Sequence, residues 1–240
     1  MPVALITGAS RGLGLALAGG LADRGWSLVI DARNPDPLAD AARELTARAG
    51  SAGTVTSLAG SVTDPGHRAE LVEAAALLGG PDLVVNNAGL LGPSPLPAVA
   101  DLGLAAYREI LEVGTVAPLA LTQLALPHLA ARGGAIVNVT SDAAVEGYAG
   151  WGGYGSAKAA LEQWSNVLAA ELAEGQHDVR LWWVDPGDLR TQMHQDAFPG
   201  EDISDRPLPD TVVPAFVRLI TERPPSGRFR ATDLLDGLAA

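Results

Sequence analysis

Tyr154 and Lys158 stand four residues apart in a stretch of small and apolar residues with helical periodicity. Side chains at positions i and i+4 of a helix lie on one face, so the phenol and the ammonium would be neighbours. A free tyrosine, with a pKa near ~10, is a poor acid or base at neutral pH, and a nearby cation lowers that pKa. The pair therefore indicates proton transfer at a substrate oxygen, although the same two residues also suit an ordinary amphipathic helix.

Ser141 lies at the end of a Val/Ile-rich run, thirteen positions before Tyr154. If that run is a strand, the serine stands at its carboxyl end, where open α/β sheets place their ligands. Its hydroxyl could then hydrogen-bond the oxygen at which the reaction occurs. Considered alone, Ser141 is equally well read as a cap or turn residue.

A glycine-rich turn, Thr7-Gly8-Ala9-Ser10-Arg11-Gly12-Leu13-Gly14, directly follows the first strand-like run and opens a helical one. Backbone amides and the helix dipole would converge there on an anion such as a pyrophosphate. Gly8 permits a sharp turn, Gly12 a close approach of the backbone to phosphate, and Gly14 close packing of helix on strand. The spacing differs from G-x-G-x-x-G, so the cluster indicates a dinucleotide only together with its strand-turn-helix context.

The end of the second strand-like run offers determinants for both forms of the cofactor, in Asp31-Ala32-Arg33. An acid there suits the ribose 2′-hydroxyl of NAD, and an arginine suits the 2′-phosphate of NADP. Arg33 and Arg11 could approach the same ribose from two sides with charge-assisted contacts. They favour NADP, unless both are simply solvated surface arginines.

These residues must be positioned by alternating strands and helices, which predict a doubly wound parallel sheet in a three-layer α/β/α single domain over 1–240. Pro93, Pro95 and Pro97 break the chain, and residues 186–214 hold five prolines and many acids. We expect no regular helix or strand there and a mobile substrate lid at about 188–210. The expected strands are 3–7, 26–31, 54–59, 83–85, 135–140, 179–184 and 227–230, and the expected helices, alternating between the two faces, are 12–24, 37–49, 66–78, 104–131 and 155–174.

Composition narrows the possible ligands. A net charge of −12 repels nucleic acid and anionic membranes, so we expect neither as a partner and a small ligand in a shaped pocket instead. The chain has no cysteine, and its four histidines, 67, 128, 177 and 194, lack metal-ligand spacing, so no metal is expected. We find no run of some 20 apolar residues and no leader peptide, and expect a soluble, cytoplasmic protein.

Five motifs, Thr7-Gly8-x-x-x-Gly12-x-Gly14, Asn86-Asn87-Ala88-Gly89, Ser141, Tyr154-x-x-x-Lys158 and Pro186-Gly187, occur in the order and spacing of the classical short-chain dehydrogenase/reductase family. The chain resembles that family over nearly its whole length, which implies a Rossmann-like fold and a nicotinamide dinucleotide as cofactor, for which the two arginines favour NADP. The resemblance implies that Tyr154 is the proton donor or acceptor, that Ser141 binds the reacting oxygen, and that Lys158 holds the nicotinamide ribose.

The cofactor site that the family implies extends beyond the catalytic residues. Asn87 to Gly89 would lie under the adenosine side, while Leu189 and Thr191 would touch the carboxamide or the phosphates. The full expected set is Gly8, Ser10, Arg11, Gly12, Leu13, Gly14, Arg33, Val62, Asn87, Ala88, Gly89, Tyr154, Lys158, Pro186, Gly187, Leu189 and Thr191.

The sequence departs from the family at two positions. Gly114 stands where relatives commonly have an asparagine that steadies a helix kink and a water leading to the lysine. Glycine has no side chain to donate but leaves a carbonyl and room for water, so we expect a weakened or rerouted proton relay. Ser61, followed by Val62, replaces an aspartate that faces the adenine amino group, and its hydroxyl can still accept that hydrogen bond.

The sequence thus predicts an NADP-dependent carbonyl reductase or alcohol dehydrogenase in which Tyr154 protonates the oxygen as hydride reaches the carbonyl carbon. Two alternatives stay open: a non-redox lyase, isomerase or cyclase, favoured by Gly114, and a binding module that reports NADPH. Apolar surface on helices 104–131 and 155–174 favours a homodimer or homotetramer. The expected substrate is a modest ketone or aldehyde, held in a mostly apolar pocket by Asp142, Ala143, Tyr148, Trp151, Met193, His194 and Phe198.

Overall fold

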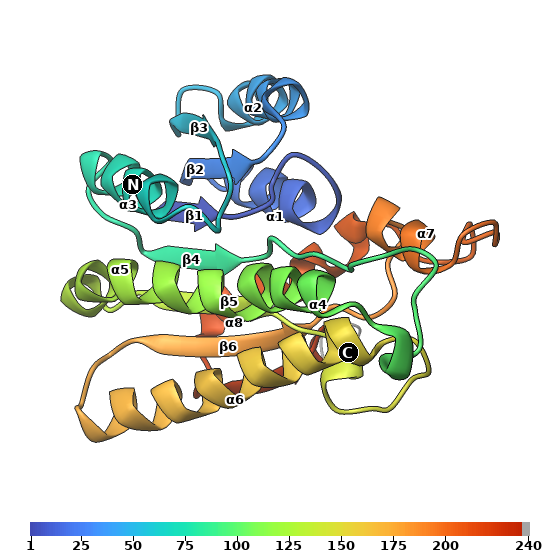
Figure 1. The fold of residues 1–240 in the computed structure, drawn as a ribbon. Helices are drawn as coiled ribbons and strands as arrows, with labels where there is room; N and C mark the ends of the chain where they lie inside the picture. Colours follow the sequence, from blue (N-terminus) through green and yellow to red (C-terminus); the bar gives the residue numbers. More distant parts are fainter. Residues whose placement is uncertain (237–240) are drawn as a thin grey trace.

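Seven parallel strands form one sheet at the centre of the molecule, in the order β3-β2-β1-β4-β5-β6-β7. The computed structural model describes residues 1–236, and Figure 1 shows the sheet flanked by helices. The predicted doubly wound, three-layer α/β/α architecture is confirmed. The strands are β1 (Val3–Ile6), β2 (Ser27–Ala32), β3 (Val55–Ala59), β4 (Leu83–Asn86), β5 (Ala135–Val139), β6 (Arg180–Asp185) and β7 (Gly227–Arg230).

The central strands are buried along their length because helices cover both faces of the sheet. This explains why they appear in the sequence as continuous apolar runs rather than alternating ones. The edge strands β3 and β7 are only partly buried. The register pairs Ile6 of β1 with Ile30 of β2 and Val85 of β4, which brings the carboxyl ends of these strands to one edge.

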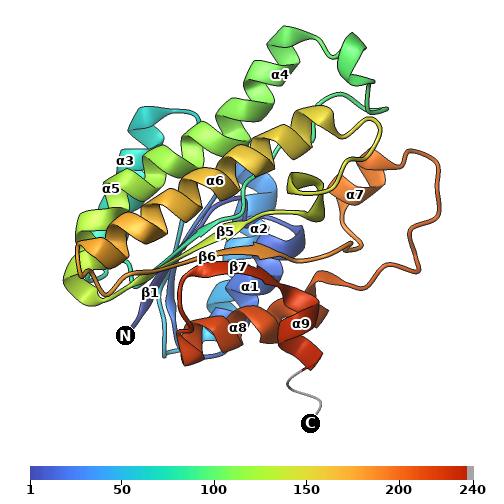
Figure 2. The ribbon, with the colours of Figure 1, turned by 90° about the horizontal axis from the view of Figure 1, so that it is seen from below.

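The helices fall into two groups rather than alternating, so that part of the prediction is wrong. One apolar cluster joins the sheet to α1, α2 and α8, and another joins its opposite face to α3, α5 and α6. Figure 2 shows the two layers on either side of the sheet. Successive crossovers from β1 to β3 run in one direction, and the order reverses at β4, which moves α3, α5 and α6 to the other face. Helix α8, between β6 and β7, departs from this pattern, because it packs with α1 on the first face. The helices are α1 (Gly12–Ala22), α2 (Pro35–Ala49), α3 (Pro65–Leu77), α4 (Leu104–Leu111), α5 (Ala117–Arg132), α6 (Gly152–Glu174), α7 (Gln192–Ala197), α8 (Val213–Glu222) and α9 (Ala231–Asp236).

The segment expected as one helix over 104–131 is interrupted. Between α4 and α5 the residues Glu112–Val116 form a π-helical turn, and Gly114 lies buried within it. The continuous helical stretch Leu104–Arg132 is long and apolar enough to cross a membrane by length and composition, contrary to the absence expected from the sequence. In the fold it is the crossover between β4 and β5, with Leu121, Ala125 and Leu129 buried in the core.

Residues 186–214 are more ordered than their prolines indicate. The short helix α7 lies inside the segment expected to be irregular, and α8 begins at its end with Pro214 in the first turn. Proline is tolerated in a first turn because the amide it lacks would have no partner in the helix. Proline content was therefore a poor guide to structure here.

Candidate active site

A cavity of about 1140 Å³ opens along the carboxyl edge of the sheet, where the strand order reverses between β1 and β4. The turns after the first six strands, β1 to β6, form its walls, together with α6 and α7. Its lining includes the whole expected catalytic set and every expected cofactor residue except Gly14: Gly8, Ser10, Arg11, Gly12, Leu13, Arg33, Val62, Asn87, Ala88, Gly89, Ser141, Tyr154, Lys158, Pro186, Gly187, Leu189 and Thr191.

Two glycines of the glycine-rich turn, Gly8 and Gly14, are packed too closely to carry a side chain. Gly8 has a φ of +67°, and a Cβ there would lie 2.9 Å from the Cα of Ala88. Gly14 faces away from the cavity, and a Cβ on it would lie 2.5 Å from the Gly8 carbonyl oxygen. Asn87 secures the turn, because its side-chain amide donates to the carbonyls of Thr7 (2.9 Å) and Gly8 (3.1 Å). The turn therefore leaves its backbone free to face a ligand at the start of α1.

Asp31 is not available to a ribose hydroxyl. It is 1% exposed, and one carboxylate oxygen accepts the Gly8 amide at 2.8 Å while the other lies 3.1 Å from Nε2 of His67. The hydrogen bond to Asp31 raises the pKa of His67 above its ordinary value. Asp31 and His67 thus form a buried pair behind the turn, a structural role that the sequence analysis did not identify.

Two arginines, unlike Asp31, are available to a ligand in the cavity. Arg11 and Arg33 both line the cavity and are exposed, and within residues 1–236 neither guanidinium forms an ion pair or hydrogen bond. Ser61 and Val62 also line this end. The hydroxyl of Ser61 lies 2.8 Å from that of Thr63. This end therefore presents two free cations and an aliphatic side chain.

Tyr154 and Lys158 project from one face of α6 into the cavity, with the ammonium 5.4 Å from the centroid of the phenol ring. The Lys158 ammonium also donates to the Val139 carbonyl at 2.7 Å. Burial lowers the pKa of Lys158 to about 8, against a smaller opposing effect of Glu162. Burial, and then the carboxylates of Asp185 and Asp142, hold the pKa of Tyr154 well above its ordinary value. The expectation that Lys158 lowers the pKa of Tyr154 is therefore wrong.

Ser141 is oriented by its own neighbours. Its hydroxyl donates to Asp142 at 3.0 Å and accepts the Ala143 amide at 3.1 Å, which caps a short 3₁₀ turn. The Tyr148 hydroxyl donates to the other oxygen of Asp142 at 3.0 Å. A substrate carbonyl would have to compete with the Asp142 carboxylate for the proton of Ser141.

The helix interruption next to the site forms without the usual asparagine. Thr115, beside Gly114, donates its hydroxyl to the Ala157 carbonyl at 2.7 Å, which ties the π-helical turn to α6. A Cβ on Gly114 would lie 3.1 Å from the Ala157 Cβ. The glycine therefore allows α4 and α5 to approach the helix that carries Lys158.

The substrate end of the cavity contains four of the seven predicted residues, namely Asp142, Trp151, Met193 and His194. Ala143, Tyr148 and Phe198 do not line the cavity. Phe198 packs behind it, 5.0 Å from His194 and 6.0 Å from Trp151 between ring centroids.

His194 lies in the segment for which no regular helix is expected, and that expectation is wrong. It belongs to α7 and is 9% exposed. Within the described part of the chain its buried Nε2 has no hydrogen-bond partner, while Nδ1 lies 3.9 Å from the Asp188 carboxylate. This nitrogen is enclosed by the protein, so a ligand in the cavity would reach it only if the imidazole ring turned. Among residues 1–236 there is no cluster of histidine, aspartate and glutamate side chains that could hold a metal ion.

Comparison with known proteins agrees with this geometry. A family model for short chain dehydrogenases matches residues 2–202. Short chain dehydrogenase asqE of Emericella nidulans is 33% identical over 174 residues, 71% of this chain but only 64% of that protein. L-xylo-3-hexulose reductase of Hypocrea jecorina is 35% identical over 218 residues, 82% of this chain and 69% of that one. The structure of an alcohol dehydrogenase from Thermococcus sibiricus complexed with 5-hydroxy-NADP has a TM-score of 0.82 and 30% identity, and covers 96% and 94% of the two chains. The chain belongs to the classical short-chain dehydrogenase/reductase family.

Proposed function

We propose that this protein is an NADP-dependent oxidoreductase that reduces a ketone or aldehyde to an alcohol. The observation that supports it most is that one cavity holds both the glycine-rich turn and the set of Ser141, Tyr154 and Lys158. When bound, the nicotinamide ring of the cofactor supplies or accepts the hydride.

Tyr154 acts as the general acid. Its raised pKa keeps the phenol protonated at neutral pH, which suits donation of a proton to a carbonyl oxygen as the carbonyl carbon is reduced. Lys158, whose ammonium lies on the ring face, stabilises the phenolate that remains. Ser141 turns its hydroxyl from Asp142 to the same substrate oxygen.

The cavity fits NADP better than NAD. The acid that would hold a ribose 2′-hydroxyl is already bonded to Gly8 and His67. Two unpaired arginines, Arg11 and Arg33, face the same end of the cavity, where a dianionic 2′-phosphate would neutralise them. The turn beneath, in which Cβ atoms at Gly8 and Gly14 would collide with backbone, suits a pyrophosphate against bare amides.

The substrate carries a polar group some distance from its carbonyl. Most of this end is apolar, formed by Trp151 and Met193, but two residues with polar side chains, His194 and Asp142, also line the cavity. A hydroxylated ketone or aldehyde would satisfy both, and one relative is named as a hexulose reductase. The described residues 188–210, with α7 among them, form the lid over this end of a single domain.

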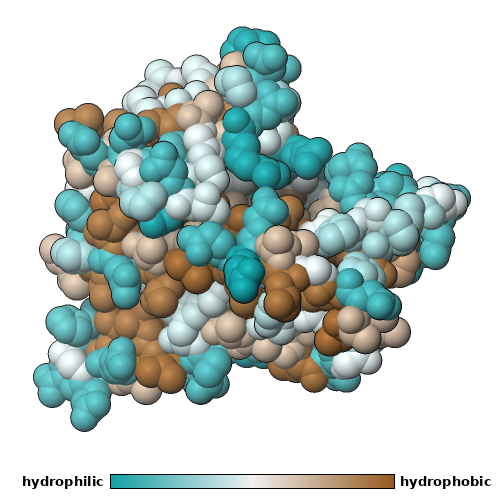
Figure 3. All heavy atoms as spheres, viewed as in Figure 1, coloured by the Kyte–Doolittle hydropathy of each residue, from teal (hydrophilic) through white to brown (hydrophobic). Residues whose placement is uncertain are grey.

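We also propose a homo-oligomer that buries the face of α5 and α6. Figure 3 shows apolar side chains gathered over these helices, and the exposed large residues there include Val116, Leu124 and Val167. Exposed apolar surface of this kind commonly marks a subunit contact. A gel-filtration mass equal to the 24.6 kDa of one chain would contradict this proposal.

The test of the enzymatic proposal is the loss of NADPH absorbance with a panel of hydroxylated and plain ketones and aldehydes, run in parallel with NADH. Tyr154→Phe removes only the acidic hydroxyl and should abolish turnover while leaving NADPH binding measurable by its fluorescence. Turnover that survives Tyr154→Phe would contradict the role of Tyr154. Tight NADPH binding with no oxidation across the panel would favour a non-redox lyase, isomerase or cyclase.

A further inference from the structure

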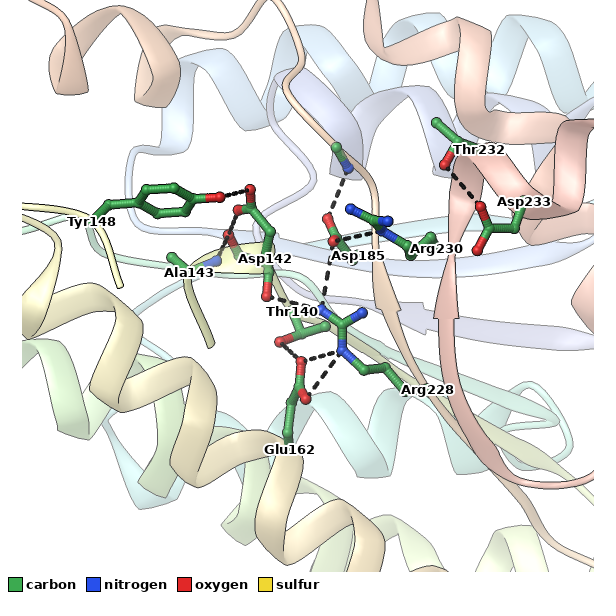
Figure 4. Close-up of polar contacts among 12 residues, drawn as sticks. Thr140, Asp142, Ala143, Tyr148, Glu162, Asp185, Arg228, Arg230, Thr232 and Asp233 are labelled. Atoms are coloured by element: carbon green, nitrogen blue, oxygen red, sulfur yellow. Dashed lines mark hydrogen bonds and ion pairs between the residues drawn. The ribbon is translucent and has the colours of Figure 1, made fainter. Parts of the chain in front are cut away.

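An ionic cluster lies directly behind Ser141. Arg228 of β7 donates to both oxygens of Glu162, at 3.0 and 3.2 Å, and to the Ser141 carbonyl at 3.2 Å. The Thr140 hydroxyl donates to the same Glu162 at 2.7 Å. Figure 4 shows these contacts from α6, β7 and the end of β5 converging. These contacts could not be predicted from the sequence, since Arg228 and Ser141 are 87 positions apart.

Three consecutive residues at the end of β5 are therefore each held by a side chain. The Val139 carbonyl accepts from Lys158, the Thr140 hydroxyl donates to Glu162, and the Ser141 carbonyl accepts from Arg228. Lys158 and Glu162 are one turn apart on α6. The cluster thus fixes the strand end that carries Ser141 against the helix that carries the lysine.

The cluster is charged although it is largely buried. The side chains of Glu162, Asp185 and Arg228 are 12%, 5% and 26% exposed. Nη2 of Arg228 lies 3.5 Å from the Asp185 carboxylate, and Nε of Arg230 lies 4.0 Å from the same carboxylate. Removing charges from water costs free energy that such pairs recover only in part, so stability alone is a weak reason for them. A role in holding the residues of the neighbouring site explains these buried charges better than stability does.

We propose that Glu162 and Arg228 are positioning residues for the reaction, which hold Ser141 and Lys158 in their places beside Tyr154. Arg228 acts through the Ser141 backbone, and Glu162 acts through Thr140 and Arg228. Lys158 is held through the Val139 carbonyl at the same strand end. This inference rests on the proposed function for its kinetic part only.

Two members of the cluster also act on the titrating groups of the site: after burial, Glu162 affects the pKa of Lys158 and Asp185 affects that of Tyr154. Tyr154 and Lys158 share α6 with Glu162, Asp142 follows β5, Asp185 ends β6, and Arg228 and Arg230 come from β7. Removing the negative charge of Glu162 should make the Lys158 cation less favourable. Removing the positive charge of Arg228 should make it more favourable. The two single variants should therefore move Lys158 in opposite directions, which a purely structural role would not do.

The experiment uses Lys158 as its own probe, because it is the sole lysine in the sequence. Protein grown with ¹³Cε-lysine gives one lysine signal, whose shift is followed as the pH passes the Lys158 pKa of about 8. We expect a lower midpoint in Glu162→Gln and a higher midpoint in Arg228→Gln. Midpoints that stay unchanged, or that move in the same direction, would overturn the proposal.

The kinetic arm measures kcat with a substrate found in the NADPH assay. Arg228→Gln should lower kcat by at least about tenfold, because small displacements of a group that binds the reacting oxygen slow the reaction strongly. Arg218→Gln is the matched control: Arg218 is 27% exposed, pairs with Glu222 at 2.9 Å and donates to the Leu234 carbonyl, all outside the cavity lining. The control should lose thermal stability without a change in kcat or in the Lys158 midpoint.

The double variant Glu162→Gln/Arg228→Met separates positioning from folding. Replacing both members of a buried ion pair by neutral residues often restores stability, so its Tm should exceed that of either single variant. Its kcat should stay low because the Ser141 carbonyl still lacks the Arg228 donor and keeps only the amide of Ala144, which lies in its own turn. Recovery of kcat together with Tm would show that the cluster only stabilises the fold. If Arg228→Gln does not fold, the double variant replaces it, and its kcat decides.

The two proposals can fail separately. Failure of the proposed function would appear as turnover in Tyr154→Phe, or as none in the wild type, while the Lys158 titrations still test the cluster. Failure of the cluster would leave the lysine midpoints unchanged while Tyr154→Phe still lacks activity.

Discussion

The carboxylate of Asp31 accepts a hydrogen bond from the Gly8 amide at 2.8 Å, which joins the end of β2 to the phosphate-facing turn after β1. The other oxygen of this carboxylate contacts His67 on α3. A Cβ at the neighbouring Gly60 would lie 2.3 Å from Nδ1 of that ring, so the imidazole is closely confined. A residue expected to select between nucleotides is instead part of the support for the turn.

This buried pair predicts how stability depends on pH. The hydrogen bond to Asp31 raises the pKa of folded His67, so the pair's contribution is full below the unfolded pKa of about 6.5 and is lost as the pH rises through the folded pKa. His67→Gln should therefore cost about 1 to 3 kcal/mol in unfolding free energy at pH 6, and less at pH 9. Urea unfolding at both pH values measures the difference. Equal losses at the two pH values would contradict a charged histidine.

The strands could be predicted and the grouping of the helices could not. Apolar runs bounded by turn residues mark a strand buried on both faces, as in β1 and β5, whatever its neighbours are. The face that a crossover helix covers depends on strand order, which local periodicity does not contain. Helix α8 is not among the expected helices; it begins inside the proline-rich segment 186–214, and its Pro214 stands in the first turn, where proline is tolerated.

In the site, too, local motifs could be predicted from the sequence and contacts between distant residues could not. Motifs with fixed spacing, such as Tyr154 and Lys158 on one helix, could be located from the sequence. The partners of Asp31 could not, because His67 is 36 positions away and the contact depends on the packing of α3 against the sheet. The electrostatic setting of Tyr154 was also beyond sequence, since burial and the carboxylates of Asp142 and Asp185 outweigh the lysine.

The two cavity arginines predict the cofactor preference. Arg33→Ala should raise the KM for NADPH by about ten- to one-hundredfold and leave the KM for NADH nearly unchanged, because a charge-assisted hydrogen bond contributes about 1.5 to 3 kcal/mol. Arg11→Ala should act in the same direction. Arg43→Ala is the control, since that guanidinium pairs with Asp40 on the outer surface of α2. A parallel loss for both nucleotides would indicate that Arg33 does not read the 2′-phosphate.

The carboxylate of Asp142 predicts a shift in the pH profile. It raises the pKa of Tyr154 and accepts the Ser141 proton, so Asp142→Asn should lower the phenol's pKa. Reduction requires the protonated phenol. The alkaline limb of the pH–rate profile for reduction should therefore move to lower pH. In the oxidative direction, which requires the phenolate, the acidic limb should move the same way.

Glu146→Gln serves as its control, because this acid lies in the same loop and affects the pKa of Tyr148 rather than that of Tyr154. The control should leave both limbs where they are in the wild type. If Asp142→Asn and Glu146→Gln shift the limbs equally, the effect is one of overall charge and not of the Asp142 position.

Gly114 predicts a balance between helix propensity and packing. Alanine is favoured over glycine in a helix by about 1 kcal/mol, but overpacking a buried contact costs about 1 to 3 kcal/mol. The added Cβ would lie 3.1 Å from that of Ala157, which precedes Lys158 on α6. We expect Gly114→Ala to be destabilising, with the free energy of unfolding measured in urea.

The pairing of Gly114 with Ala157 gives the control. In an Ala157→Gly background the close contact is absent, so Gly114→Ala should become neutral or stabilising there, and the two substitutions should be coupled favourably in a double-mutant cycle. Additive effects would mean that α6 shifts freely to accept the methyl group. In that case the glycine is not required by packing, and the larger asparagine usual in the family should also be accepted at position 114 without loss of stability.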